Sequence, residues 1–247
     1  MGGVLCEPVA GMTSPIIEPV AKPAAVPAAT PIIDRRAFIL ANTQLTAPPM
    51  LPEIPLHLAT EVTPLWEATE STLAASNLPP PYWAFAWPGG RAVARHVLDV
   101  PELVAGKRVL DFAAGSGMIA IAAAKAGAAE VLAVEIDDFA ATVIGLNAEA
   151  NGVAVRTVCE DIVGQPLPDI DVVLAGDVCY EKPMAERVIG WLRGLAREGV
   201  LVIIGDPGRA YVPKTGLQAL AKFAVPTSLD LEDREVRDTM VWRLLGD

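Results

Sequence analysis

The chain has 247 residues, of which 52% are hydrophobic and 5% aromatic, and its formal net charge is −11. The acidic balance argues against a nucleic-acid partner, three scattered cysteines argue against a disulfide framework or a zinc set, and no apolar run reaches the roughly 18 residues of a membrane span. With the first basic residue at Lys22, no targeting signal is visible. We therefore expect a cytoplasmic monomer that holds no metal and binds neither nucleic acid nor a membrane.

The N-terminal part divides into an extension and a segment that we expect to pack on the core. Residues 1–36 are rich in Pro and Ala without a sustained hydrophobic period, which predicts a flexible extension. The pattern that follows predicts these elements before residue 106: a short helix over 34–45, a short strand outside the main sheet over 54–59, and helices over 63–76 and 91–98. Between the last two helices lies an aromatic cluster, in which we expect Tyr82 and Phe85 to be buried.

The remaining residues, 107–247, alternate between apolar runs and segments that favour helices. We predict strands around Val109 and over 130–136, 155–159, 171–176 and 200–205, and helices over 118–126, 138–151, 182–197 and 214–223. A closing pair of strands is expected near 227–231 and 239–244, with the second at the edge of the sheet. Such alternation predicts an α/β fold with a doubly wound, Rossmann-like sheet and right-handed crossovers.

The stretch Arg108–Gly117 combines a strand, a tight turn and the start of a helix. Its apolar run ends in the carboxylate of Asp111, and Gly115 and Gly117 bracket the turn. Glycines let a ligand approach the main chain closely, and the start of a helix offers unpaired N–H groups. We therefore predict that a small polar molecule binds on this turn.

Two carboxylates narrow the kind of molecule. Glu135 ends the next apolar run, where an α/β nucleotide site places the acid that accepts the ribose hydroxyls. The turn also fits the loose dinucleotide pattern G-x-G-x-x-A, so an NAD-dependent dehydrogenase is an alternative. Asp111 opposes that alternative, because we expect it to point into the crevice where a pyrophosphate would lie, and like charges repel there. A ligand with an ammonium group would suit the site better.

The same stretch resembles motif I of the seven-strand, class I methyltransferases, whose cofactor S-adenosylmethionine carries an ammonium, a ribose and a sulfonium but no phosphate. The resemblance makes residues 107–247 the catalytic core and S-adenosylhomocysteine the product. It implies that Asp111 and the turn hold the methionine half, Glu135 the ribose and Asp161 the adenine amino group. We expect Trp87 to line the cofactor site and to contact the positively charged group of the cofactor with the face of its ring. The implied cofactor-binding residues are Trp87, Asp111, Phe112, Ala113, Gly115, Ser116, Gly117, Glu135, Ile136, Asp161 and Asp177.

A further acid follows the fourth core strand. Ligand crevices of open α/β sheets lie beyond the carboxyl ends of the strands, so we expect Asp177 and Tyr180 to face the same opening as Glu135. The segment Asp177-Val178-Cys179-Tyr180 is similar to the acid-x-x-Tyr pattern of lysine-directed seven-strand methyltransferases. This similarity implies that Asp177 and Tyr180 are catalytic, with Asp177 guiding and orienting the substrate amine. The alternative is that Asp177 only caps the helix that begins near Lys182.

Residues 52–59, 80–90 and 205–213 extend the resemblance. They are similar to the electron transfer flavoprotein β-subunit lysine methyltransferases, and the match covers roughly residues 37–247. The resemblance implies methylation of lysines in the recognition loop of that β subunit. We expect Glu181, Asp206 and Arg209 to contact the substrate, with the alternative that Arg209 braces its loop through Asp206. Methylation of a ribosomal protein or a small molecule, and a cofactor-binding scaffold without activity, are the other hypotheses.

Overall fold

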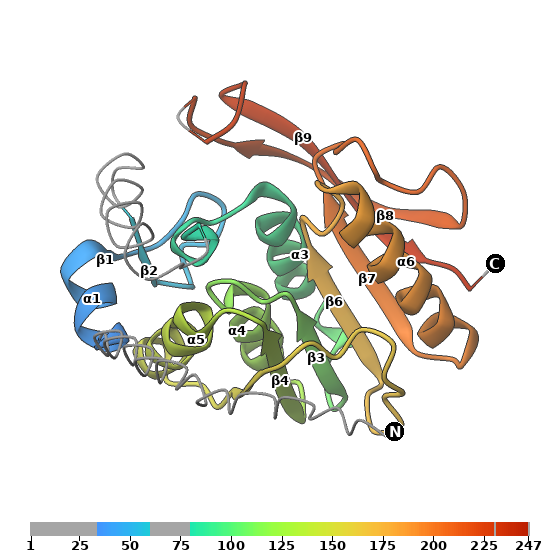
Figure 1. Cartoon of the computed structure of the whole chain (residues 1–247), viewed down its shortest axis with the longest axis horizontal. Helices are drawn as coiled ribbons and strands as arrows, with labels where there is room; N and C mark the ends of the chain where they lie inside the picture. Colours follow the sequence, from blue (N-terminus) through green and yellow to red (C-terminus); the bar gives the residue numbers. More distant parts are fainter. Residues whose placement is uncertain (1–33, 60–79, 230, 247) are drawn as a thin grey trace, which may run out of the picture. The chain divides into compact units, whose positions relative to one another are not determined.

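A seven-stranded sheet with the strand order β5-β4-β3-β6-β7-β9-β8 organises the part of the chain described by the computed structural model, residues 34–59, 80–229 and 231–246 (Figure 1). The parallel strands are β3 (Arg108–Phe112), β4 (Glu130–Glu135), β5 (Arg156–Cys159), β6 (Val172–Gly176) and β7 (Leu201–Asp206). The antiparallel strands are β8 (Leu217–Pro226) and β9 (Val236–Leu244). The predicted doubly wound α/β fold with an antiparallel closing hairpin is confirmed.

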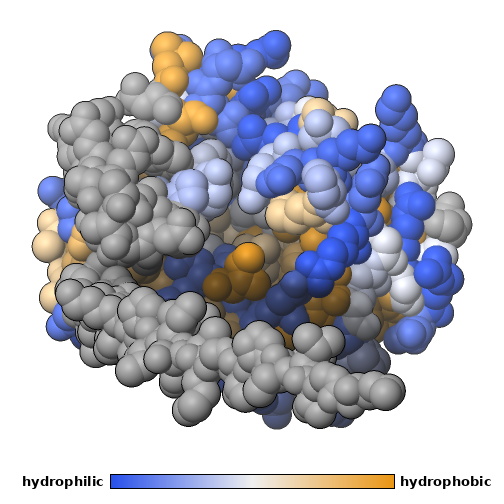
Figure 2. All heavy atoms as spheres, viewed as in Figure 1, coloured by the Kyte–Doolittle hydropathy of each residue, from blue (hydrophilic) through white to orange (hydrophobic). Residues whose placement is uncertain are grey.

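Helices cover both faces of this sheet (Figure 1). On one face α3 (Pro88–Asp99), α4 (Met118–Lys125) and α5 (Asp138–Asn151) pack on a cluster that includes Val109, and on the other α6 (Lys182–Arg197) packs on a cluster that includes Leu110. Neighbouring strand residues thus enter opposite cores, as the alternation of a strand requires. On the side seen in Figure 2, apolar atoms lie deep near the centre with hydrophilic residues around them. Among the described helices, none is both long and apolar enough to span a bilayer.

The segment before the core contains a short helix and a small two-stranded sheet, and its apolar residues pack on the core clusters. Asp34 caps α1 (Arg35–Asn42) by accepting a hydrogen bond from the Ala37 N–H at 3.0 Å. The strand β1 (Gln44–Thr46) pairs antiparallel with β2 (Leu56–Leu58), apart from the main sheet. Short 3-10 helices follow, η1 (Tyr82–Ala84) and η2 (Pro101–Leu103). The short helix and the separate strand were predicted, β1 was not, and the predicted helix over 63–76 lies outside the described residues.

The helix predicted over 214–223 is wrong. Residues 217–226 form β8 at the edge of the sheet, and β9 lies inside, between β7 and β8. The side chains of Ala221, Phe223 and Val225 pack on the core and alternate with the exposed Lys222 and Ala224, and this period of two outweighs the helix propensity of Ala and Leu. The strand predicted over 227–231 belongs to the connection of the hairpin, and the second hairpin strand is not the edge strand.

Asn147 on α5 joins the small sheet to the turn after β3. Its side chain is fully buried, its Oδ1 accepts the His57 N–H at 2.7 Å, and its Nδ2 donates to the Ser116 carbonyl at 2.8 Å. Both backbone groups would lose a partner if this amide were removed. Asn147 therefore connects the N-terminal segment to the turn on which the site is built.

Replacing Asn147 tests this connection. Asn147→Ala is expected to lower the free energy of unfolding by about 1–3 kcal/mol, because it leaves buried polar groups unpaired. Urea denaturation measures the change. Glu149→Ala on the same helix serves as the control, since the Glu149 side chain is 69% exposed; we expect it to stay within about 0.5 kcal/mol of the wild type. Equal effects of the two substitutions would contradict this role of Asn147.

Candidate active site

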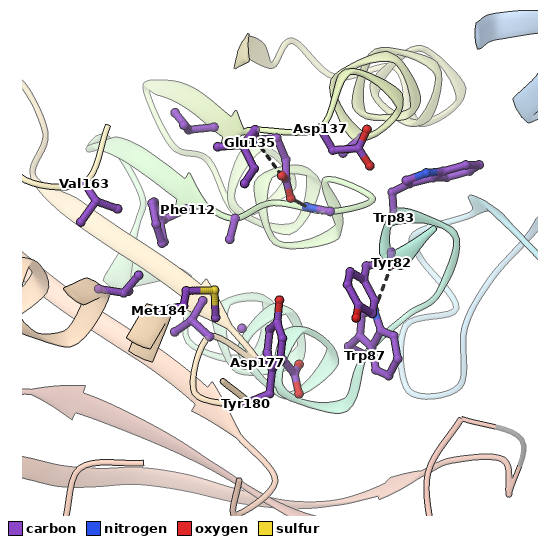
Figure 3. A pocket seen from close by; sticks show the side chains of 18 of the residues that line it. Tyr82, Trp83, Trp87, Phe112, Glu135, Asp137, Val163, Asp177, Tyr180 and Met184 are labelled. Atoms are coloured by element: carbon purple, nitrogen blue, oxygen red, sulfur yellow. Dashed lines mark hydrogen bonds between the residues drawn. The ribbon is translucent and has the colours of Figure 1, made fainter. Parts of the chain in front are cut away.

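A cavity of about 570 Å³ opens at the carboxyl ends of the parallel strands (Figure 3). Its wall includes residues that follow β3, β4, β5, β6 and β7, together with side chains of α6 and of the aromatic segment before α3. The volume falls in the range of roughly 300–1,000 Å³ that is common for small-molecule sites. Because β3 and β6 are neighbours at the point where the strand order reverses, the cavity occupies the usual ligand position of an open α/β sheet.

The turn after β3 is held by Glu135. Ala113, Gly115 and Gly117 adopt φ angles of 53°, 53° and 76°, a left-handed region that favours glycine. The carboxylate of Glu135 accepts the Gly115 N–H at 2.7 Å and the Ile136 N–H at 2.9 Å (Figure 3). Burial raises the pKa of Glu135, and the two N–H groups oppose that rise. Each carboxylate oxygen keeps a lone pair with which it can accept a hydroxyl of a ligand.

Apolar and charged side chains lie beside Glu135 on the cavity wall. Ile136 is 75% exposed there, so that its side chain is open to the flat face of a base. Asp161 pairs with Arg187 of α6 at 2.7 Å, and this hydrogen bond is the main reason that the pKa of Asp161 lies below its ordinary value. Arg187 and Met184 were not predicted as site residues. Arg187 and Val188, which also lines the cavity, follow Met184 by three and four residues, and this helical spacing is the signal that marks this face of α6.

Asp111 does not point into the crevice, and that expectation is wrong. Its side chain is fully buried, and its Oδ2 accepts the Ala120 N–H at 2.8 Å in the first turn of α4. An acid is favourable there because the start of a helix carries unpaired N–H groups and a partial positive charge. Oδ1 has no hydrogen-bond partner among the described residues, and burial raises the pKa of Asp111 to about 8. Buried Ser116 likewise lies behind the turn rather than on the cavity wall.

Asp177 caps α3 and not α6. It follows β6 with a φ of 56°, and its Oδ2 accepts the Gly90 N–H at 2.9 Å. The helix α6 begins after Glu181, and among the described residues no side chain caps it, so the predicted alternative role of Asp177 is wrong. The helix α3 begins at Pro88, earlier than predicted, and its first turn carries this N–H group. Burial raises the pKa of Asp177 to about 7, although Arg209 acts in the opposite direction.

Aromatic rings lie at the same end of the cavity as Asp177 (Figure 3). Tyr180 is 46% and Tyr82 44% exposed, and their ring centroids lie 6.0 Å apart. Trp87 meets Tyr82 edge-on at 6.0 Å, and its indole N–H donates to the Tyr82 carbonyl at 2.9 Å. Phe85 is buried as predicted, whereas the predicted burial of Tyr82 is wrong. The exposed ring faces can bind a cation.

The predicted substrate residues lie in different environments. Glu181 is exposed and outside the cavity wall, whereas Arg209 lines the cavity. Asp206 is 2% exposed, and its Oδ1 accepts the N–H groups of Gly208 at 2.7 Å and Arg209 at 2.6 Å. Asp206 therefore shapes the loop after β7 through main-chain N–H groups, so that the predicted bracing contact between Arg209 and Asp206 is made by the Arg209 backbone. The side chain of Arg209 pairs instead with Glu232, a residue that the sequence did not single out.

Comparison with known proteins places these features in a family. Residues 97–178 match the family model of ribosomal protein L11 methyltransferase (PrmA). The electron transfer flavoprotein beta subunit lysine methyltransferase of Xenopus laevis is 37% identical over 213 residues, which cover 84% of this chain and 85% of that protein. This chain belongs to the electron transfer flavoprotein beta subunit lysine methyltransferase family.

Another curated relative agrees with this membership of the lysine methyltransferase family. The human protein of the same name is 34% identical over 214 residues, which cover 84% of this chain and 80% of that protein. A solved structure of magnesium protoporphyrin IX methyltransferase from Synechocystis PCC 6803 with bound SAM aligns with a TM-score of 0.47 and 18% identity, over 63% of this chain and 79% of that chain. The resemblance predicted from the sequence is confirmed by the curated relatives.

The burial of Asp111 predicts a specific pH dependence of folding. The pKa of this acid is about 8 in the folded chain, against an ordinary value of 3.8, so the folded chain keeps a proton that the unfolded chain loses. Its contribution to stability is complete below about pH 4 and is lost as the pH rises to about 8. We expect the free energy of unfolding, measured with urea across this window, to fall less steeply in Asp111→Asn than in the wild type.

Asp161→Asn is the matched control for this experiment. The pKa of Asp161 is lowered, so its contribution to stability is present at neutral pH and is lost only as the pH falls through its folded-state pKa. This variant should keep the wild-type decline at higher pH. A decline in Asp111→Asn as steep as in the wild type would show that Asp111 is ionised in the folded protein.

Proposed function

We propose that this protein transfers methyl groups from S-adenosylmethionine to lysine side chains of the electron transfer flavoprotein β subunit. The observation that carries the proposal is that one cavity contains both a nucleoside-type carboxylate, Glu135, and the acid-x-x-Tyr pair Asp177 and Tyr180. The names of the curated relatives support the substrate. The match to the ribosomal protein L11 methyltransferase model ends at residue 178 and therefore supports the cofactor half without indicating a ribosomal substrate.

The residues of the cavity fit a positively charged, phosphate-free cofactor. Carboxylates outnumber guanidinium groups among the described residues of its wall. The carboxylates are those of Glu135, Asp137, Glu160, Asp161 and Asp177, and the guanidinium groups are those of Arg187 and Arg209. This excess of negative charge favours a sulfonium and an ammonium and disfavours a diphosphate. In addition, the Gly115 N–H, which a phosphate-binding turn would offer to its ligand, already donates to Glu135. The NAD-dependent alternative is therefore the weaker one.

We assign the parts of the cofactor to the residues as follows. Glu135 would accept the ribose hydroxyls, Ile136 and Asp161 would contact the adenine, and Trp87 would flank the methionine part. Phe112, Ala113 and Gly115 line the adjoining wall, whereas Asp111, Ser116 and Gly117 would support the turn from behind. Bound there, S-adenosylmethionine supplies a methyl group on a positively charged sulfur that an uncharged amine can attack.

The residues that would prepare the substrate amine lie at the end of the cavity away from Glu135 (Figure 3). A lysine ammonium has an ordinary pKa near 10.4 and must lose a proton before it can react. The carboxylate of Asp177, fixed by the Gly90 N–H, can draw in the ammonium and orient it, and the ring faces of Tyr82, Trp87 and Tyr180 can bind the cation. Alignment matters more than acid or base strength in such a transfer, because the departing group is a neutral thioether.

We infer the cellular setting from the chain's own chemistry. Cys159 is an exposed free thiol and Cys179 a buried one, which supports a reducing compartment such as the cytoplasm. The net charge of −11 supports a cationic protein surface as partner and opposes nucleic acid. We propose that the protein acts as a cytoplasmic monomer.

Calorimetric titration tests the cofactor. We expect the wild type to bind S-adenosylmethionine, and Glu135→Ala to bind it at least about tenfold more weakly, because it loses the ribose acceptor and the bonds that hold the turn. Glu160→Ala is the charge-matched control, since it removes a carboxylate from the same wall without disturbing the turn, and we expect a change within about threefold. Tight binding of NAD without binding of S-adenosylmethionine would exclude the methyltransferase reaction.

Methylation of purified electron transfer flavoprotein β subunit tests the reaction itself. We expect peptide mapping by mass spectrometry to find methylated lysines with the wild type, and Asp177→Asn to lower turnover at least about a hundredfold by removing the charge that guides the amine. The affinity of this variant for S-adenosylmethionine should change less than about threefold, which separates chemistry from cofactor binding. In a cell extract, label from the cofactor that appears only on small metabolites would refute a protein substrate.

A further inference from the structure

We infer that Glu232, in the connection between β8 and β9, is a positioning residue that keeps the carboxylate of Asp177 available to the substrate amine by holding Arg209. This inference rests on the proposed function, because it gives Glu232 a part in preparing the lysine site. The groups involved come from the end of β6, the loop after β7 and the hairpin connection.

The topology of the sheet brings the hairpin connection to the cavity. Since β9 is antiparallel to both β7 and β8, β8 runs parallel to β7 and ends at the same edge of the sheet. Backbone hydrogen bonds join described residues of the connection that follows: the Thr227 N–H donates to the Glu235 carbonyl at 2.8 Å, and the Glu232 N–H donates to the Ser228 carbonyl at 2.9 Å. Glu232 therefore has a defined position at the carboxyl edge, beside Arg209.

Glu232 holds the guanidinium of Arg209 with both oxygens. Nη2 of Arg209 lies 2.5 Å from Oε1, and Nη1 lies 3.2 Å from Oε2. Arg237 approaches Oε2 from another side, with Nε at 3.1 Å and Nη2 at 3.0 Å. The Glu232 side chain is only 2% exposed, so these paired charges are shielded from solvent. A bidentate ion pair of this kind fixes both the position and the orientation of a guanidinium.

The fixed guanidinium leaves Asp177 only loosely engaged. Nη2 of Arg209 reaches Oδ1 of Asp177 at 3.4 Å, which is longer than an ordinary charged hydrogen bond, while Oδ2 is bonded to the Gly90 N–H. Arg209 thus forms a bidentate ion pair with Glu232 and only a single weak contact with Asp177. Without Glu232, the guanidinium would be free to form a bidentate ion pair with Asp177. It would then compete with an incoming lysine ammonium for the Asp177 carboxylate. Glu232 therefore acts on the reaction through Arg209, without touching the substrate.

The test compares two acids of the same connection. Glu232→Gln keeps the shape of the side chain and removes its charge, and we expect kcat with the flavoprotein β subunit to fall at least about tenfold while the affinity for S-adenosylmethionine is unchanged. Asp233→Asn is the matched control, because Asp233 is 67% exposed and pairs with Arg237 rather than Arg209. It should retain the wild-type kcat. Equal behaviour of the two variants would overturn the inference.

A double-variant cycle distinguishes positioning from general loosening of the hairpin. In single-turnover reactions, adding Glu232→Gln to Asp177→Asn should cause no further loss, because Glu232 acts through a carboxylate that is already gone. Losses that multiply would overturn the inference. If Glu232→Gln does not fold, Glu232→Asp replaces it: this variant keeps the charge but is too short to hold the Arg209 guanidinium with both oxygens, and we expect the same loss and the same lack of additivity. An unchanged kcat in Glu232→Asp would also refute the inference.

The wild-type reaction in the same series separates the two proposals. If the wild type transfers no methyl group to the flavoprotein β subunit, the proposed function fails, and this inference fails with it. If the wild type is active and Glu232→Gln matches Asp233→Asn, only the inference about Glu232 fails.

Discussion

The close approach of α3 to the ends of β6 and β7 is the constraint on which the site depends. A Cβ atom on Gly89 would collide with the Gly205 carbonyl and with the carboxylate of Asp177, and one on Gly176 would collide with the backbone of Gly90. Only glycines let the first turn of the helix lie directly on the strand ends. The approach aims the Gly90 N–H at Asp177, and it starts α3 immediately after Trp87, whose ring then faces the cavity.

The same arrangement occurs at two neighbouring strands, β6 and β3. Asp177 accepts an N–H from the first turn of α3, and Asp111 accepts one from the first turn of α4. Asp111 is fully buried, the side chain of Asp177 is only 10% exposed, and burial raises both pKa values, so the helix N-termini supply the compensation that solvent would otherwise give. The difference lies in access: Asp177 lines the cavity and Asp111 does not. Two similar carboxylates can therefore have different roles, one toward a ligand and one within the scaffold.

The sequence predicted those parts of the fold that local patterns determine. The helices over 138–151 and 182–197 were predicted with their correct bounds, because the Gly152 cap marks the end of the first and a clear apolar period marks the second. The helix predicted over 214–223 was wrong because the Ala and Leu residues there suit a helix, whereas pairing with β9 fixes residues 217–226 as a strand. Asp111 failed for another reason: a strand position sets the face on which a side chain lies, but not whether a helix covers it.

Ion pairs between side chains far apart in the sequence, such as that of Glu232 and Arg209, could not be predicted. Glu135, Asp177 and Tyr180 were found because each follows an apolar strand at a position where ligand sites occur, and the structure brings them to one cavity. Glu232 carries no such signal, since it lies in a short polar connection far along the chain from Arg209. Its place is decided by the antiparallel insertion of β9, which returns β8 to the carboxyl edge of the sheet. In this family member the closing hairpin therefore does more than complete the sheet, because its connection lies where it can control the charge next to Asp177.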